Sequence, residues 1–554
     1  MYKCVGSILT SINSNISINN PFKPQGKKDV KETELGLFYT NDMHGDVNRL
    51  AKFKTAHDTF KKANKNTPNL TLSAGDCLFG TDKQRNSLMV KLFNIMGLDA
   101  LALGNHEFAG GSKNLSDSLK NAKFTSVSAN LELDENNPLK DRIKDKKLVK
   151  SAVFMKGGHK FAVIGASPFD SYINTVDKTV KPMEIDRTIK AINEEAKSLE
   201  KQGVNKIILC SHLGYGEDAD LKVARETEGI DIIVGGHTHT TIDGVNKQNN
   251  GGTHKLNLLM SKRNEPVIIT QAGGMNQKVG YLNVLFDEKG VIKTESIKNN
   301  LLDVNMFTES KVAQDLMNKE LGKKIELATV KGNYAPNSSY RERYLENPLH
   351  NTFADALLDC GKKYGAEISL FQASTMRGGA NKNITNYDIK YSMLPFNNEL
   401  KLVDITEKDL VEVLKNTSGS ILTSDKDTQL VRCAGMNYSV RNDKEYFLNG
   451  GKSPIEALNI QGRDIDVKNP SETKTVKAVM TNFLFSMPTT KNIMAKYQNS
   501  AKTIGNEQGA LSDYLTKVGS VDMNKQEQRI KLSTTYSSYD DLIATRKEVM
   551  TNLC

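Results

Sequence analysis

The sequence lacks long apolar runs and paired cysteines. A membrane-spanning helix needs about 18 or more consecutive apolar residues, and no run approaches that length. The apolar stretch at residues 4–9 is also too short for a signal peptide. The six cysteines lie far apart, with no CxxC pair to indicate a zinc site, a redox site or a disulfide framework. We therefore expect reduced thiols, no membrane partner and a cytoplasmic location.

The chain also lacks blocks of positive charge. It has 75 Lys and Arg residues against 65 Asp and Glu residues, a formal net charge of +10, but the lysines are spread along the sequence. A groove for a nucleic-acid strand needs a basic stripe interleaved with aromatic residues, which is not evident here. With 38% hydrophobic and 25% charged residues, the composition is typical of a globular protein. We expect no nucleic-acid polymer as a partner, and the sequence leaves the oligomeric state open.

The chain is too long for one hydrophobic core, so at least two domains are expected. In its first half, apolar runs alternate with helix-like segments, a pattern typical of a layered α/β sandwich. The domain prediction is a disordered leader at 1–33, a first domain at 34–303, a linker helix at 304–335, a second domain at 336–533 and a tail or appended helix at 534–554. Predicted helices cover 87–96, 187–202, 308–327 and 352–362, and predicted strands of the second unit cover 368–371 and 401–405.

Five short apolar runs each lead into side chains that can bind a metal ion. The carboxyl ends of strands are where open α/β sheets place their ligands. Five of the nine histidines in the chain fall in these motifs, more than chance placement would give. The predicted strands and the residues that follow them are 37–40 with Asp42 and His44, 70–73 with Asp76, 100–103 with Asn105 and His106, 207–210 with His212, and 232–234 with His237 and His239.

The residue types in these motifs suit divalent metal ions. The carboxylate of Asp42 and the imidazole of His44 together accept zinc, manganese, iron, nickel or cobalt. Asp76 has two oxygens with which it can bridge two ions, and the neutral amide of Asn105 limits the total negative charge. The remaining histidines would complete two coordination shells. The alternative interpretation is that these groups form ordinary hydrogen bonds at strand ends.

These ordered motifs resemble those of the calcineurin-like metallophosphoesterases, and the second unit resembles the C-terminal domain of bacterial and animal 5′-nucleotidases. The resemblance implies an α/β fold class, with a four-layer αββα sandwich followed by a smaller α/β domain that a linker helix joins to it. Relatives of this kind are often exported, so a periplasmic or exported protein is the alternative location. The motifs are Asp42-x-His44, Gly75-Asp76, Gly104-Asn105-His106-Glu107, His212 and Gly236-His237-x-His239.

The resemblance also implies two divalent metal ions as cofactors, with Mn, Zn, Co and Mg as candidates. Two ions about 3.5 to 4 Å apart can bridge a hydroxide for in-line attack on phosphorus. By the resemblance, one ion would be held by Asp42, His44, Asp76 and His239, and the other by Asp76, Asn105, His212 and His237.

His106 is the predicted catalytic residue, as a general acid or a stabiliser of the transition state. The alternative is a purely structural histidine. Members of the nucleotidase family commonly read Asn-His-Glu-Phe-Asp at this point, whereas this chain has Ala109 in the last position. A carboxylate partner fixes the tautomer of an imidazole and stabilises its charged form. Without it we expect slower turnover or a substitute partner from elsewhere in the fold.

Four residues of the second unit are predicted to bind the substrate. Arg377 corresponds to an arginine that nucleotidases place near the substrate phosphate, and Gln372 stands where some members carry Asn. Phe396 lies in a match to the Leu-Pro-Phe-Gly-Gly pattern, and Phe483 is the second ring of a sandwich around the base. The family usually follows that second ring with a Gly-Gly-Asp-Gly-like loop, which is missing here. The alternatives are a surface salt bridge for the arginine and ordinary core packing for each ring.

The predicted function is a metal-dependent phosphohydrolase that releases phosphate from nucleotides, as 5′-nucleotidases do. A 2′,3′-cyclic nucleotide phosphodiesterase with 3′-nucleotidase activity and a UDP-sugar hydrolase remain open, because all three need the same attack on phosphorus. A hypothesis from another class is a nucleotide-binding protein with weak catalysis, which Ala109 and the missing glycine loop motivate.

Overall fold

The computed structural model describes residues 21–24, 26, 32–78, 80, 82–169, 173, 176–248, 255–332, 344–379, 382–424, 430–451 and 454–553. Two compact units divide the chain between Lys323 and Lys324, inside the segment predicted as the linker. Each unit has its own sheets and its own core. Within the described part of the chain, no helix is both long and apolar enough to cross a membrane.

Two seven-stranded sheets stack face to face in the first unit. Leu37 of β1 (Thr33–Thr40) belongs to the core between the sheets, and so does Ile208 from the opposite sheet. The next residue of β1, Phe38, faces the other way and packs against Phe53, with ring centroids 5.5 Å apart. Because both faces of the strand are covered, every residue of β1 is buried.

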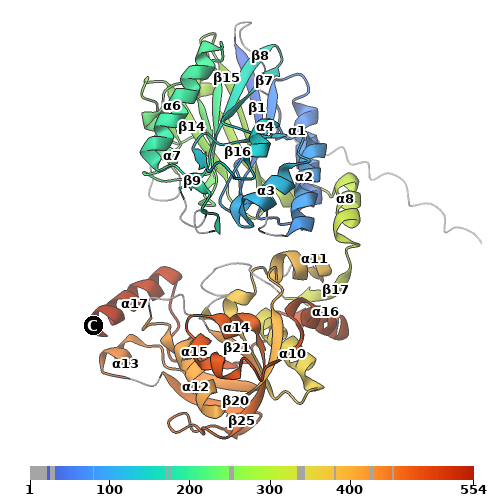
Figure 1. The fold of residues 1–554 in the computed structure, drawn as a ribbon, viewed down its shortest axis with the longest axis vertical. Helices are drawn as coiled ribbons and strands as arrows, with labels where there is room; N and C mark the ends of the chain where they lie inside the picture. Colours follow the sequence, from blue (N-terminus) through green and yellow to red (C-terminus); the bar gives the residue numbers. More distant parts are fainter. Residues whose placement is uncertain are drawn as a thin grey trace, which may run out of the picture. The chain divides into compact units, whose positions relative to one another are not determined.

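Helices cover the outer face of each sheet. Phe53 lies on helix α1 (Leu50–Ala63), so α1 covers the first sheet. Ile192 of α6 and Leu221 of α7 share a core cluster with Leu209 of the second sheet. Figure 1 shows α1 and α2 on one side of the strands and α6 and α7 on the other. The predicted αββα sandwich is therefore confirmed.

The strands that precede the metal-type motifs run parallel to one another within each sheet. The first sheet has the order β16-β15-β1-β2-β3-β4-β6, and the second has the order β12-β14-β11-β10-β8-β7 with β13 paired to β14. The remaining strands of the first unit are β2 (Asn69–Ser73), β3 (Ala100–Ala102), β4 (Thr125–Val127), β5 (Leu131–Leu133), β6 (Leu148–Val149), β7 (Ser151–Lys156), β8 (His159–Ala166), β9 (Val180–Pro182), β10 (Ile207–Ser211), β11 (Ile232–Val234), β12 (Thr241–Ile242), β13 (Leu258–Met260), β14 (Pro266–Ala272), β15 (Lys278–Phe286) and β16 (Lys298–Asp303).

Local signals set the ends of the helices. The side chain of Asp82 accepts a hydrogen bond from the Arg85 amide at the start of α2, and Gly97 ends that helix with a φ of 69°. The predicted helices at 87–96 and 187–202 correspond to α2 and α6. The other helices of the first unit are α2 (Lys83–Met96), α3 (Gly111–Leu119), α4 (Lys140–Lys144), α6 (Ile185–Lys201), α7 (Asp220–Glu226) and α8 (Lys311–Leu321), with a 3₁₀ turn at His106–Phe108.

Part of the predicted leader is anchored in the first unit. Most of residues 1–33 lie outside the described residues, but Phe22 is fully buried. Its ring lies 6.0 Å from Phe60, 5.5 Å from Tyr281 and 5.9 Å from Phe307, measured between centroids. The prediction of a disordered leader is therefore wrong at Phe22, because an aromatic cluster from three distant segments encloses it.

A five-stranded sheet with the order β21-β18-β25-β20-β26 forms the centre of the second unit. Phe371 on one of its faces shares a cluster with Leu511 of helix α16. Leu370 on the other face packs with Leu410 of α12 and with residues of a four-stranded sheet. The last helix, α17, adds Val549 to this second cluster. The end of the chain is thus an appended helix that packs on the core.

The predicted helix at 308–327 is shorter in the structure. Ser310 caps α8, which ends at Leu321, and the following residues form β17 (Glu326–Lys331). β17 pairs with β19 and β27 in a three-stranded sheet. The other elements of the second unit are α10 (Pro348–Lys362), β18 (Ile368–Gln372), β19 (Asn383–Thr385), α11 (Asn386–Asp388), β20 (Glu399–Thr406), α12 (Glu407–Asn416), β21 (Val431–Ala434), β22 (Met436–Val440), α13 (Lys444–Leu448), β23 (Ile455–Ile460), β24 (Arg463–Asp464), β25 (Thr475–Thr481), α14 (Asn482–Ser486), α15 (Lys491–Met494), β26 (Lys502–Asn506), α16 (Glu507–Val518), β27 (Ser520–Asp522), β28 (Ile530–Leu532) and α17 (Tyr539–Leu553).

Candidate metal centre and substrate-binding residues

The metal-type motifs follow β1, β2 and β3 in the first sheet and β10 and β11 in the second. Parallel pairing brings the ends of these strands together, as Thr40 pairs with Ser73 and Cys210 with Val234. The loop after β1 is joined to the loop after β2 by a backbone hydrogen bond from the Asp42 amide to the Gly75 carbonyl, 2.9 Å long. Side chains from both sheets therefore meet at one edge of the sandwich.

Five of the predicted ligands have a left-handed backbone. Residues other than glycine rarely adopt positive φ, and such positions cost about 1 to 3 kcal/mol unless the surroundings hold them. Strained positions of this kind cluster at functional sites. The φ angles are 51° at Asp42, 48° at His44, 54° at Asp76, 74° at His237 and 52° at His239.

Asp42, His44 and His239 form the first group of side chains that could hold an ion. The Nε2 atoms of the two histidines are 2.9 Å apart, and His239 Nε2 lies 3.4 Å from Asp42 Oδ1. Ligands that lie about 2 Å from one shared ion are spaced in this way. The His237 amide donates to both oxygens of Asp42, at 3.1 and 2.9 Å, which fixes the carboxylate.

Asp76, His212 and His237 form the second group. One oxygen of Asp76, Oδ1, accepts a hydrogen bond of 2.8 Å from the His106 amide. Its other oxygen lies 3.1 Å from His212 Nε2 and 4.0 Å from His44 Nδ1, so Asp76 is within reach of both groups. The Oδ1 atom of Asn105 lies 3.1 Å from Nδ1 of the His237 ring. The seven side chains predicted as ligands are thus all brought together.

His212 tests whether this cluster fits a metal ion. Its Nδ1 lies 2.5 Å from the carbonyl oxygen of Ala74, which can only accept, so Nδ1 carries the proton. The other ring nitrogen, Nε2, is buried and has no hydrogen-bond partner among the described residues. An imidazole with one nitrogen held by a backbone carbonyl and the other turned toward a carboxylate is arranged as metal-binding histidines are. The nitrogen and oxygen donors therefore fit a divalent cation.

The charges of the cluster are shifted in opposite directions. Burial lowers the pKa of His44 to about 4, which keeps its imidazole neutral at physiological pH. Burial alone would lower the pKa of His212 too, but the Asp76 carboxylate, the Asp42 carboxylate and the Ala74 carbonyl together outweigh burial and raise that pKa to about 10. Burial would likewise raise the pKa of Asp76, yet the charge of His212 holds it well below its usual range. The Asp76 carboxylate thus favours a positive charge at Nε2 of His212, and a divalent cation held there would replace the proton.

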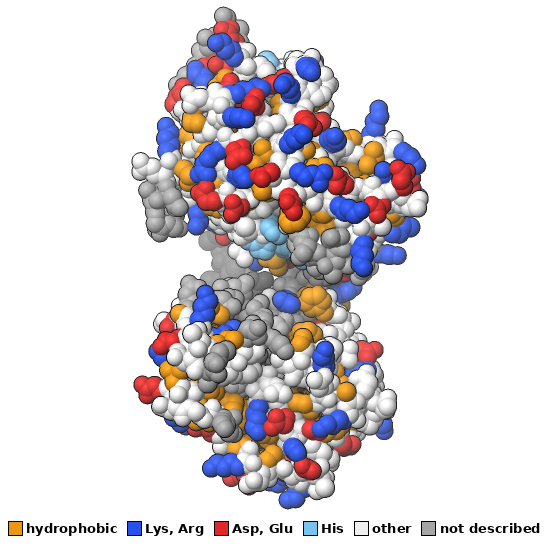
Figure 2. Space-filling model, turned by 60° about the vertical axis from the view of Figure 1, so that its left-hand side comes forward, with side chains coloured by type: hydrophobic (Ala, Val, Ile, Leu, Met, Phe, Trp, Pro, Cys, Tyr) orange, Lys and Arg blue, Asp and Glu red, His pale blue; other side chains and the backbone are white. Residues whose placement is uncertain are grey.

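His106 lies beside the same group. Its ring centroid is 4.5 Å from that of His44, and one of its ring nitrogens lies within 4.8 Å of a ring nitrogen of His44 and of a carboxylate oxygen of Asp76. Among the described residues, no carboxylate forms a hydrogen bond with the His106 ring. Ala109, which stands where the family has Asp, has Gly80 as a neighbour. The substitute partner that we considered for His106 is therefore not found in the described part of the chain. Figure 2 shows histidine side chains, in pale blue, grouped at the surface of the first unit, and His239 has 44% of its side chain exposed.

Glu107 supports the site through its side chain, although its sequence motif did not predict a role for it. Its buried carboxylate accepts four backbone hydrogen bonds of 2.7 to 3.0 Å, which tie the loop after β2 to the loop after β3. A buried carboxylate is stabilised only by such donors. Its place in the motif, between the predicted catalytic His106 and two apolar positions, was the available signal. The four donors are the amides of Asp76, Cys77, Leu78 and Gly104.

In the second unit, Arg377 and Phe396 lie together. The guanidinium carbon of Arg377 is 5.3 Å from the centroid of the Phe396 ring, within the range of a cation–π contact. Phe396 is 57% exposed, which is unusual for a large aromatic side chain and favours a binding role over core packing. Phe483 is half-buried on α14 and packs partly against the hydrophobic core, and its place as the second ring around the base stays a prediction. Gln372 is 1% exposed at the end of β18, and its substrate contact stays a prediction.

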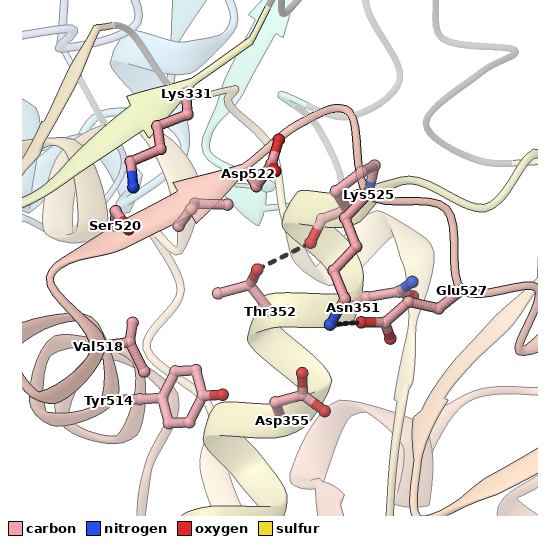
Figure 3. A pocket seen from close by; sticks show the side chains of 12 residues that line it. Lys331, Asn351, Thr352, Asp355, Tyr514, Val518, Ser520, Asp522, Lys525 and Glu527 are labelled. Atoms are coloured by element: carbon pink, nitrogen blue, oxygen red, sulfur yellow. Dashed lines mark hydrogen bonds and ion pairs between the residues drawn. The ribbon is translucent and has the colours of Figure 1, made fainter.

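A cavity of about 240 Å³ lies elsewhere in the second unit, between α10, the C-terminal end of α16 and β27 (Figure 3). Two of its acidic side chains form ion pairs, and one of these pairs joins Glu527 to Lys525. Asp355 is likewise paired with Arg529, at 2.9 Å. The loop at residues 394–398, here called the Phe396 loop, contacts the opposite, N-terminal end of α16. The cavity is therefore separate from the predicted substrate residues.

Each of the two units matches a known protein family. Residues 37–241 match the calcineurin-like phosphoesterase family, and residues 326–486 match the C-terminal domain of 5′-nucleotidases. The chain is 30% identical over 435 residues to the trifunctional nucleotide phosphoesterase protein YfkN of Bacillus subtilis; the match covers 69% of this chain but only 27% of that much longer protein. It is 26% identical over 455 residues to a probable 5′-nucleotidase of Treponema pallidum, covering 71% of this chain and 74% of that one.

The fold is shared with a solved structure. The 5′-nucleotidase precursor from Thermus thermophilus matches 91% of this chain and 100% of its own, with a TM-score of 0.59 and 24% identity. This likeness concerns the arrangement of the elements in both units. The chain therefore belongs to the calcineurin-like phosphoesterases, in the two-domain form that carries a 5′-nucleotidase C-terminal domain.

Proposed function

We propose that the protein is a metal-dependent phosphoric monoester hydrolase that releases phosphate from nucleoside 5′-monophosphates. The observation that carries the proposal is the pair of ligand groups around Asp76, whose carboxylate lies 3.1 Å from His212 Nε2 and 4.0 Å from His44 Nδ1. In this proposal Asp42, His44, Asp76 and His239 hold one divalent ion, and Asp76, Asn105, His212 and His237 hold the other. Two bound ions neutralise phosphoryl charge and lower the pKa of bound water.

The protein side chains position the reacting groups. The Asp42 carboxylate is held by the His237 amide and the Asp76 carboxylate by the His106 amide, so neither has to reorganise when substrate arrives. The His106 ring, beside His44, donates a hydrogen bond to a phosphoryl oxygen or gives its proton to the leaving oxygen. Water reaches the site from the side on which His239 is exposed.

Arg377 and Phe396 bind the nucleotide in the second unit. The guanidinium is suited to a phosphate, and the exposed ring to one face of the base, where stacking contributes about 1 to 3 kcal/mol per base. Stacking tolerates different bases, so we expect a broad preference for nucleotides over phosphate esters without a base.

A substrate and metal panel tests the proposal. Metal-stripped protein is loaded in turn with manganese, zinc, cobalt or magnesium, and phosphate release is measured from AMP, 3′-AMP, 2′,3′-cyclic AMP, UDP-glucose and ribose 5-phosphate. We expect AMP to give the highest kcat/KM with at least one metal, and the stripped protein to be inactive. A preference for the cyclic substrate or for UDP-glucose would replace the proposed substrate by one of those classes. Activity that survives complete metal removal would refute the metal-dependent reaction.

A second candidate is a nucleotide-binding protein with weak catalysis. It is favoured by Ala109 and by the lack, among the described residues, of a carboxylate bonded to His106. The two candidates differ in the response to His106→Ala. A loss of about 100-fold or more in kcat, with nucleotide binding retained, supports the enzyme. Tight binding with the same low phosphate release before and after the substitution supports the binding protein.

A further inference from the structure

The loop that carries Phe396 is tied to the N-terminal end of α16. The amide of Glu507 donates to the Asn398 carbonyl at 3.0 Å, and Gln508 Nε2 donates to the Leu394 carbonyl at 2.8 Å. The same Nε2 lies 3.4 Å from the carbonyl of Lys390. The first residues of α16 therefore hold the loop through its backbone on both sides of the exposed ring.

Two asparagine side chains of the loop add to these bonds. Asn398 Nδ2 donates to a carboxylate oxygen of Glu507 at 3.0 Å, and Asn397 Oδ1 accepts from the Gln508 amide at 3.4 Å. Asn397 has a φ of 49°, the conformation for which glycine is otherwise preferred. In the Leu-Pro-Phe-Gly-Gly pattern both positions are glycine, which has no side chain to make either bond. The attachment is thus a feature of this chain's own residues.

The loop is also linked to Arg377. The Arg377 amide donates to the Met393 carbonyl at 2.8 Å, just before the loop, and its guanidinium lies over the Phe396 ring. A movement of the loop would therefore separate the ring from the cation. Glu507 is itself fully buried, so its contact with Asn398 is shielded from water and from salt.

We propose that Glu507 and Gln508 are positioning residues, which hold the Phe396 ring beside Arg377 in the arrangement that accepts a nucleotide base. The inference rests on the proposed function, because it assigns these residues to the binding of the nucleotide base. A free loop would have to be ordered each time a nucleotide binds, and preorganisation removes that entropic cost. The residues act on substrate affinity and on the preference for a base, and they do not touch the reacting phosphate.

Kinetics of four full-length variants test the proposal. Glu507→Ala and Asn398→Gly remove the same bond from its two ends, Glu507→Gln keeps an acceptor, and Asp513→Asn removes an exposed charge elsewhere on α16. We expect Glu507→Ala and Asn398→Gly each to raise KM for AMP about fivefold, as the loss of a hydrogen bond of about 1 kcal/mol would. KM for ribose 5-phosphate and kcat should change less than about twofold, as a residue that acts only through the base-binding loop implies.

Two further comparisons between variants decide whether the proposal holds. Glu507→Gln should retain most of the AMP affinity, and the double variant Glu507→Ala/Asn398→Gly should be no worse than either single variant, because both remove one bond. Equal losses with AMP and ribose 5-phosphate, or fully additive losses in the double variant, would overturn the proposal. Asn398→Gly is a surface-loop change that leaves the buried core intact, so it keeps the test valid if Glu507→Ala does not fold.

A fluorescence measurement tests the loop without relying on activity. The chain contains no tryptophan, so Phe396→Trp places a single reporter on the loop. In this background Asn398→Gly should lower the anisotropy of the tryptophan and increase its quenching by acrylamide, whereas Asp513→Asn should change neither. If AMP is not a substrate at all, the proposed function fails while this result still reports on the attachment of the loop. Unchanged anisotropy in Asn398→Gly would show that the bonds do not position the ring.

Discussion

At the scale of single residues, the candidate metal centre is packed so tightly that the loop after β3 has no room for a side chain at Gly104. Gly104 lies where the loop after β3 passes the Asp76 and His212 side chains. A Cβ atom at this position would lie 2.7 Å from His212 Nε2 and closer still to Asp76 Oδ1. Contacts under 3 Å between such atoms force a displacement. The absence of a side chain at position 104 is therefore a requirement of the ligand geometry.

We predict that Gly104→Ala weakens metal binding without unfolding the protein. The methyl group would push Asp76 and His212 apart, so the metal content measured by mass spectrometry should fall from about two ions per chain to less than about one. Gly216→Ala is the matched control, because a Cβ at Gly216 meets nothing within 4 Å. Full metal content in Gly104→Ala would contradict the geometry described for this site.

Glu107 acts at the same scale but through the backbone. Its carboxylate accepts from the Asp76 and Gly104 amides, both at 2.8 Å, and so holds the two ligand-bearing loops together. Glu107→Gln would turn an NH₂ group toward backbone N–H donors, and we predict a loss of about 2 to 4 kcal/mol in the unfolding free energy of the first unit. Chemical denaturation measures this loss. Glu135→Gln, at an exposed position, should change the same free energy by less than about 0.5 kcal/mol.

At the scale of secondary-structure elements, α16 links the stability of the second unit to pH. Burial raises the pKa of Glu507 to about 7, and the hydrogen bonds from Asn398 and the adjacent backbone offset only part of this effect. One oxygen of this carboxylate, Oε1, is buried and has no hydrogen-bond partner among the described residues. The folded state therefore binds this proton more tightly than the unfolded state, whose Glu has its ordinary pKa near 4.5.

The sign of the pH dependence follows. The contribution of protonated Glu507 to the free energy of unfolding is fully present below about pH 4.5 and is lost as the pH rises through about 7. The total change in this free energy is about 3 kcal/mol. We predict that Glu507→Gln flattens the fall in unfolding free energy of the second unit between pH 5 and pH 8. Denaturant titrations of both proteins at the two pH values measure the difference. A parallel fall in the variant would assign the dependence to other groups.

The secondary-structure elements also show which features can be predicted from local sequence patterns. The motifs from Asp42 to His239 could be placed because each follows a short apolar run, and the ends of parallel strands meet at one edge. The helix predicted at 308–327 was too long because its last residues form β17. That strand is stabilised by a partner about two hundred residues later, as Thr329 pairs with Ser520. Helical spacing within a short window carries no information about such a partner.

The same limit applies to contacts between side chains. The four amides bound by Glu107 and the bonds from α16 to the Phe396 loop depend on segments that are distant in sequence. Residue type identified Phe396 and Arg377 through a family resemblance, but it did not distinguish the exposed Phe396 from the half-buried Phe483. Exposure is a property of the packed unit and cannot be inferred from either local sequence.

At the scale of the whole molecule, the first unit extends beyond the domain start predicted from the sequence. Phe22 fills a space between Phe60, Tyr281 and Phe307, so a residue far upstream of β1 completes the packing around α1. We predict that Phe22→Ala lowers the unfolding free energy of the first unit by up to about 4 kcal/mol through the cavity that it leaves. Calorimetry of the full chain should show a lower transition for that unit only. Phe169→Ala, at a ring that is 62% exposed, should have little effect.

The proposed metal ligands come from both sheets, which has a consequence for folding. Asp42 follows a strand of the first sheet, and His237, 195 residues later, follows a strand of the second. A pair of metal ions bound between such residues is a non-covalent cross-link, and its binding energy adds to the cohesion of the sandwich by mass action. Chelation would then weaken the packing between the two sheets. Increased cleavage by proteases in the loops after β1 and β11 would report the loss of metal before any assay of turnover.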